Sequence, residues 1–121
     1  MANTFKVVNF AAEPNSAGTP YTMYTVAGST TTVVLGLILT NINTTAVTAE
    51  VELVSTTSSR GGANKVANGT SFLIKDVNIP TGSSLEILSG GKVVLEAGDK
   101  IQIDCSVADK LSGTLSIMEI T

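Results

Sequence analysis

The chain lacks most of the side chains that enzymes use for catalysis. It contains no histidine, no tryptophan and a single cysteine in 121 residues. A Ser-His-Asp triad, a Cys-His pair and a zinc site of thiolate and imidazole ligands are therefore excluded. We expect a protein that is not an enzyme and that binds no metal ion and no cofactor.

The single cysteine and the carboxylates leave little room for chemistry. Cys105 cannot form an intrachain disulfide, and it lies in the apolar register of an expected strand, so we expect a small buried hydrophobe. Glu96 with Asp99, or Asp99 with Asp104, could bind Ca²⁺ weakly or serve glycoside hydrolysis. Solvated charges beside a turn are the interpretation we favour for them.

Charge of either sign is scarce. Lys and Arg number 7 and Asp and Glu 10, for a net charge of −3, and the basic residues are spread singly. No basic stripe is available to hold phosphates or an anionic membrane surface, so we expect neither a nucleic acid nor a membrane partner. A weakly charged, polar surface suits a subunit packed among others, and it suits a quiet soluble domain equally well.

Long apolar runs are also missing. No segment reaches about 18 uninterrupted apolar residues, and no charged segment followed by an apolar run opens the chain. We expect the protein to be made and folded in the cytosol.

What the chain does have is the pattern of β-strands. Apolar residues make up 43% of the chain, and they alternate with polar residues over several short segments. The length suits one core. We predict an all-β fold, a single-domain antiparallel β-sandwich of the jelly-roll type over residues 1–121, with eight or nine short strands and loops at 11–20 and 55–70. The expected strands are residues 5–10, 21–27, 31–41, 47–53, 71–77, 85–88, 92–96, 100–105 and 114–120.

Some pairings can be predicted as well. Residues 31–41 are the most apolar run, which indicates a central strand covered on both faces; a helix is the alternative, disfavoured by its valines and Gly36. Residues 47–53 should pair with it as a hairpin. Residues 92–96 and 100–105 should form a second hairpin through a turn at 97–99, where the Asp99 carboxylate can accept backbone N–H bonds. Tyr21 and Tyr24 should lie on opposite faces.

The polar segment 55–70 has no apolar period, and it is either a contact loop that orders on a partner or simply mobile. Arg60 lies between small residues and could reach a neighbour's carboxylate. Lys65 and Asn68 are further candidate contacts in this segment. A receptor-binding module that uses this segment is an alternative function, although the scarcity of aromatic residues disfavours it.

The two ends of the chain are expected to be strands with little charge to prevent edge pairing. We therefore expect a homo-oligomer, a trimer by preference, or a component of a many-copy lattice. Phe5 and Lys6 are candidate partner contacts. Removing the residues before Val7 should therefore weaken assembly while the domain still folds.

Several segments resemble small virion structural proteins of tailed bacteriophages of the marine phage and cyanophage type. They are IKDVNIP (74–80), the link 85–92, VLEAGD (94–99) and LSIMEI (115–120), with MANTFK (1–6) and residues 33–43 upstream. The resemblance implies a non-enzymatic virion protein made in the host cytoplasm and in contact with other virion proteins. Its narrower form is a capsid decoration or cement subunit that stabilises the particle, and a tail, neck or baseplate component is the alternative.

Overall fold

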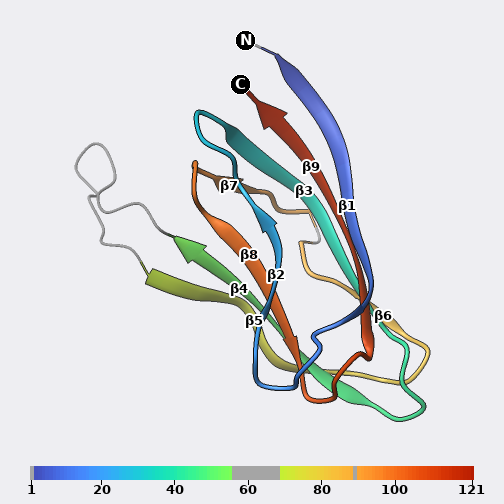
Figure 1. Ribbon diagram of the computed structural model, residues 1–121. Coiled ribbons are helices and arrows are strands. Elements are labelled where there is room, and N and C mark those ends of the chain that lie inside the picture. The colour runs from blue at the N-terminus through green and yellow to red at the C-terminus, as the bar shows by residue number, and fades with distance from the viewer. Residues whose placement is uncertain (1, 56–68, 89) are drawn as a thin grey trace.

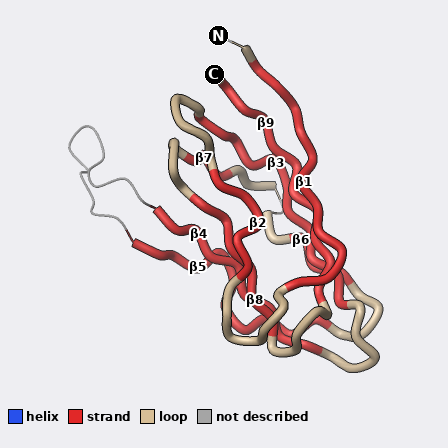
Figure 2. Tube along the Cα trace, viewed as in Figure 1, coloured by secondary structure: helices blue, strands red, loops and turns tan. Residues whose placement is uncertain are grey.

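The computed structural model describes residues 2–55, 69–88 and 90–121, and their regular structure consists of strands (Figures 1 and 2). The strands are β1 (Asn3–Glu13), β2 (Tyr21–Thr25), β3 (Thr31–Asn41), β4 (Val47–Ser55), β5 (Gly69–Ile79), β6 (Ser84–Glu86), β7 (Val93–Leu95), β8 (Lys100–Cys105) and β9 (Leu111–Ile120). The predicted all-β sandwich is confirmed.

Two antiparallel sheets make up the sandwich. Sheet A has the order β1-β9-β3-β6, with β7 also paired to β3, and sheet B has the order β2-β8-β4-β5. Figure 1 shows the two sheets as separate layers, with both chain ends at the same end of sheet A. β1 is an edge strand, and β9 and β3 form the middle of sheet A.

The core lies between the sheets and is built from alternate positions of the strands. In β9, for example, Leu111, Leu115 and Ile117 are buried, whereas Ser112, Thr114 and Ser116 reach the other face. The buried apolar residues are Phe10, Met23, Val26, Val34, Leu37, Leu39, Val47, Ala49, Val51, Ile79, Leu95, Ile101, Ile103, Cys105, Leu111, Leu115 and Ile117. Burial of Cys105 confirms its predicted role as a small hydrophobe.

The most apolar run has the predicted bounds but only one covered face. β3 spans residues 31–41 and lies between β9 and the short strands β6 and β7. Leu35 is 36% exposed and Ile38 is 43% exposed, so the prediction of burial on both faces is wrong. A two-layer sandwich covers each sheet on one side, and no described segment forms a further layer over sheet A.

Both predicted hairpins are wrong. β3 pairs with β9, β6 and β7, whereas β4 pairs with β5 and β8 in the other sheet. Likewise β7 belongs to sheet A and β8 to sheet B. Leu95 of β7 and Ile101 of β8 are both buried in the core from different sheets, so the 97–99 turn joins the two layers rather than two neighbouring strands.

The turn at 97–99 forms with the chemistry that was predicted. Gly98 has φ of 88°, and the Glu96 N–H donates to the Asp99 Oδ2 at 3.0 Å. Asp99 is buried, however, so it is not the solvated charge that we expected. Its main chain also bonds to the residue that follows β2, because the Val26 N–H donates to the Asp99 carbonyl at 2.9 Å.

Several predicted bounds and one orientation need correction. β1 runs on to Glu13, so the first loop is shorter than residues 11–20, and Ser55, Gly69 and Thr70 belong to strands. Tyr21 and Tyr24 both pack against the core, because the register of β2 on β8 shifts between Thr22 and Tyr24. That bulge turns both rings to the same face.

Candidate interaction surface

A row of apolar side chains crosses the outer face of sheet A. Phe5 of β1 lies opposite Met118 of β9, Met118 lies opposite Val33 of β3, and Val33 lies opposite Val94 of β7. Directly opposed residues have Cβ atoms about 5 Å apart, so the four side chains lie next to one another in sequence across the sheet. Phe5 is 71% exposed and Val94 is 61% exposed, so the two ends of the row face solvent.

Apolar and neutral residues extend this row along the strands. Val7, Leu35 and Ile38 are also exposed on this side. We call the outer face of sheet A the apolar face. Its strand positions are Asn3, Phe5, Val7 and Asn9; Ser112, Thr114, Ser116, Met118 and Ile120; Thr31, Val33, Leu35, Gly36, Ile38 and Thr40; Val94; and Ser84 and Glu86. Glu86, on the short edge strand β6, is the single charged residue among them.

The outer face of sheet B is charged. Glu50 and Glu52 of β4 alternate with buried residues, and Asp104 and Lys100 of β8 lie opposite Glu50 and Val54. Burial, followed by the negative charges of Glu50 and Asp104, raises the pKa of Glu52. Because charged side chains are rarely buried without a partner, this outer face of sheet B is suited to contact with solvent, in contrast to the apolar face.

The one exposed aromatic ring on sheet B has a charged neighbour. The Lys75 ammonium lies 4.6 Å from the centre of the Phe72 ring and 3.0 Å from Glu50 Oε1. A cation over an aromatic face stabilises the ring in a solvated setting. Phe72 is thus part of a charged cluster, whereas Phe5 has only apolar and neutral neighbours on its own face.

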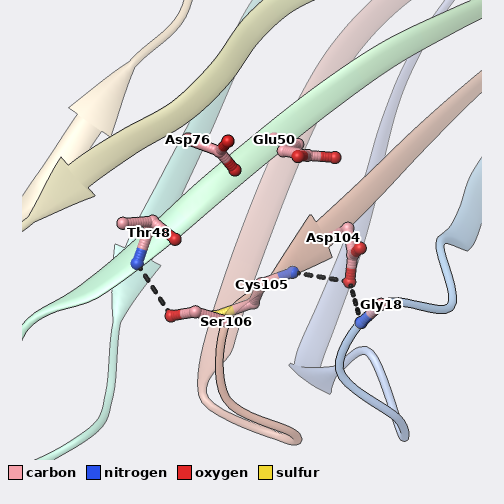
Figure 3. Close-up of a pocket in the computed structure, with 7 residues that line it drawn as sticks. All are labelled: Gly18, Thr48, Glu50, Asp76, Asp104, Cys105 and Ser106. Atoms are coloured by element: carbon pink, nitrogen blue, oxygen red, sulfur yellow. Dashed lines mark hydrogen bonds between the residues drawn. The ribbon is translucent and has the colours of Figure 1, made fainter.

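A small pocket of about 230 Å³ opens on the charged side (Figure 3). Its lining residues are Gly18, Thr48, Glu50, Asp76, Asp104, Cys105 and Ser106. Asp104 Oδ1 accepts hydrogen bonds from the N–H groups of Gly18, at 3.2 Å, and Cys105, at 2.8 Å. Burial raises the pKa of the Cys105 thiol, which disfavours the thiolate needed for nucleophilic attack. Among the described residues, no group of three or more His, Cys, Asp or Glu side chains is arranged to hold a metal ion.

Comparisons with known proteins give one result for this fold. No protein-family model and no curated protein matches the chain. One structural match is to a protein described under the words "Bacillus endospore appendages form a novel family of disulfide-linked pili". It has a TM-score of 0.46 and 17% sequence identity, and the match covers 99% of this chain and 87% of that one.

This comparison contradicts the predicted function as a bacteriophage virion protein. The matching structure is a bacterial endospore appendage, and no virion protein is found. We therefore withdraw the capsid decoration role and its tail, neck and baseplate alternatives. The receptor-binding alternative is withdrawn with them; residues 56–68 of its contact surface at 55–70 lie outside the described residues.

A polar network closes the sandwich at the end where the two chain termini lie. The Tyr24 hydroxyl of β2 donates to Glu119 Oε2 of β9 at 2.6 Å and lies 2.8 Å from the Thr32 hydroxyl of β3. The Lys6 ammonium of β1 lies 2.6 Å from Glu119 Oε1. Glu119 therefore ties sheet B to both β9 and β1. Burial and the hydrogen bond to Glu119 raise the pKa of Tyr24 to about 12.

The network makes stability depend on pH in the acid range. The hydrogen bond from Lys6 is the largest cause that lowers the pKa of Glu119, and the hydrogen bond from Tyr24 is the second. The unfolded chain therefore binds a proton at higher pH than the folded chain, so this contribution is present above about pH 5 and is lost as the pH falls through the lowered pKa. Wild type should be more stable than Glu119→Gln at neutral pH, with a difference that shrinks on acidification, as measured by urea unfolding at several pH values. A difference that stays constant with pH would show that the carboxylate charge plays no part.

The structure places only some of the predicted contact residues. Phe5 lies exposed on the apolar face, whereas Lys6 is turned to the other side of β1 and bonded to Glu119. Arg60, Lys65 and Asn68 lie outside the described residues. Sequence reasoning missed Val33, Met118 and Val94 as members of one surface. The available signal was that Val94 is apolar at a position that alternates with the buried Leu95.

Within the described part of the chain, no helix is long and apolar enough to span a membrane.

Proposed function

We propose that this chain is a non-enzymatic structural subunit that assembles with copies of itself and buries its apolar face between them. The observation that carries the proposal is the row Phe5, Met118, Val33 and Val94 across four strands. The sequence supplies no histidine for catalysis, and a net charge of −3 is small enough for like copies to approach each other. The proposal includes no cofactor, nucleic acid or membrane partner.

The contrast between the two sheets supports self-association over simple solubility. Large apolar residues scattered singly on a surface are ordinary, but contiguous apolar patches on soluble proteins usually mark interaction sites. Phe5, Val7 and Val94 are each more than half exposed, and they belong to one sheet. Among the strand positions of the apolar face only Glu86, on the short edge strand β6, is charged, so two such faces would bring few like charges together.

A charge placed in the apolar face should disrupt this assembly. Val94→Asp should weaken self-association about tenfold or more, because the new carboxylate would be buried without a partner. In the monomer, Val94 is 61% exposed, so the variant should fold normally. Sedimentation equilibrium over a range of concentrations would measure the dissociation constant, and circular dichroism would verify folding.

Val107→Asp is the matched control. Val107 is 37% exposed and lies between β8 and β9, away from the strand positions of the apolar face. The same substitution there should leave self-association within about threefold of wild type. The proposal fails if wild type stays monomeric at high concentration, or if Val94→Asp and Val107→Asp assemble equally well.

A further inference from the structure

No described strand pairs with the outer edge of β1, so the backbone hydrogen-bonding groups on that edge have no partner among the described residues. Ala2 and Thr121 exchange two hydrogen bonds, from Ala2 N to Thr121 O at 3.3 Å and from Thr121 N to Ala2 O at 3.0 Å. The register on β9 then continues without a shift from Asn3 to Phe10. Because doubly bonded pairs alternate along antiparallel strands, even-numbered residues of β1 bond to β9. The odd-numbered residues point their N–H and C=O groups to the open edge, and they are Asn3, Phe5, Val7 and Asn9.

The other edges of the described strands are less suited to pairing. β5 carries Asp76 at φ of 49°, and its register on β4 shifts twice. β2 has five residues with a register shift, and β6 and β7 have three residues each. Irregular, short or charged edges resist strand addition, whereas a long regular edge permits it. β1 combines regular register with one charged residue, Lys6, between Asn3 and Asn9.

We propose that β1 pairs with β1 of a second copy in antiparallel orientation, with Val7 on the two-fold axis. This inference rests on the proposed function, and it names the strand and the register that join the copies. Phe5 would lie opposite Asn9 of the second copy, and Asn3 opposite Ala11. The strand is its own complement, because a two-fold axis brings the same row of free groups from each copy into register.

The charge on Lys6 disfavours a two-fold axis at Lys6, and the length of the regular stretch of β1 disfavours an axis at Val8. A two-fold axis at Lys6 would put two ammonium groups directly opposite each other, which is unfavourable. An axis at Val8 would pair Phe5 with Ala11 and Asn3 with Glu13, so most pairs would fall where the register on β9 shifts, between Phe10 and Glu13. The axis at Val7 avoids the Lys6 repulsion and keeps the Phe5–Asn9 pairs inside the regular stretch.

Pairing at β1 also enlarges the apolar face. The two-fold axis is perpendicular to the sheet, so both outer faces lie on the same side. Four strands and the seven residues from Asn3 to Asn9 cover about 19 Å by about 24 Å, or about 450 Å² of projected area. The apolar faces of two monomers would together bury about 900 Å², which is less than the lower limit of about 1,200 Å² for stable interfaces. The apolar faces of two edge-paired dimers would together bury about 1,800 Å².

A proline at position 7 tests the edge without touching the ladder to β9. The Val7 N–H points to the open edge, so Val7→Pro removes no hydrogen bond inside the chain, and proline is tolerated at such edge positions. It removes one donor at the centre of the proposed pairing and places a ring there. We expect Val7→Pro to weaken self-association about tenfold or more, and Val7→Thr, which keeps the N–H, to stay within about threefold of wild type.

Cross-linking gives a second measurement that does not depend on the proline variant folding. In a Cys105→Ala background, Val7→Cys should form a disulfide-linked dimer on mild oxidation, because residues paired across the axis have Cα atoms about 5.5 Å apart. Lys6→Cys should not. A cross-link through Lys6→Cys in place of Val7→Cys, the absence of both, or a trimeric mass would overturn the inference.

The two proposals can fail separately. If Val94→Asp weakens assembly while Val7→Pro and the Val7→Cys cross-link give no sign of edge pairing, the edge inference is wrong and the proposed function stands. If neither Val94→Asp nor Val7→Pro changes the assembly, both are wrong.

Discussion

Replacing Asn41 with alanine is expected to lower the free energy of unfolding by about 2–4 kcal/mol. Asn41 is 1% exposed at the end of β3, where the chain leaves sheet A. Its Nδ2 donates to the carbonyl oxygens of Ile79, at 2.9 Å, and Thr45, at 3.0 Å, and its Oδ1 accepts from the Asn43 N–H at 2.7 Å. Alanine would leave the buried Ile79 carbonyl without this donor, and urea unfolding followed by circular dichroism would measure the loss.

Asn43→Ala is the matched control for this prediction. Asn43 is partly exposed in the same connection; its Oδ1 accepts from the Thr44 N–H at 2.9 Å, and its Nδ2 donates to the Thr45 hydroxyl at 3.2 Å. Water can replace these bonds, so its loss should cost less than about 1 kcal/mol. Equal losses at the two positions would mean that the buried carbonyl is not what makes Asn41 important.

The parts of the fold that the sequence predicts are local. The bounds of residues 31–41 follow from one apolar run with a turn on each side, and the structure has the same strand. The chemistry of the 97–99 turn follows from Gly98 and Asp99 alone, and both act there as expected. Burial of Cys105 follows from a two-residue period within one strand. Each of these features depends on residues within a few positions of one another.

The parts that the sequence does not predict depend on residues far apart in the chain. Sequence proximity suggested that 47–53 pairs with 31–41, but β3 pairs with the C-terminal strand β9 instead. The alternation of apolar residues along a strand is the same whether a turn connects two neighbouring strands of one sheet or two strands of different sheets. The apolar row has the same origin, because Phe5, Met118 and Val33 share a surface only once β1, β9 and β3 are in register. Separate strands gave no signal for that register.

Replacing Leu115 with alanine is expected to have the largest effect on stability of the changes considered, about 2–5 kcal/mol. Leu115 is fully buried in β9, opposite Val8 of β1 and Leu37 of β3. Truncating it removes apolar contacts and leaves a cavity that the surrounding ladder cannot close without breaking its hydrogen bonds. Small domains are stable by only about 5–15 kcal/mol, so the midpoint of urea unfolding should fall markedly.

The same strand supplies a control that separates folding from assembly. Thr114 precedes Leu115 but lies exposed on the apolar face, so Thr114→Ala should change the free energy of unfolding by less than about 0.5 kcal/mol. Leu115→Ala should lower that free energy without changing the self-association of the folded protein, because its side chain points away from the apolar face. Val94→Asp should do the reverse. Two results would contradict this separation of the core face from the apolar face of sheet A. One is a Leu115→Ala variant with the same urea midpoint as wild type, and the other is a folded Leu115→Ala variant whose self-association is weakened as much as that of Val94→Asp.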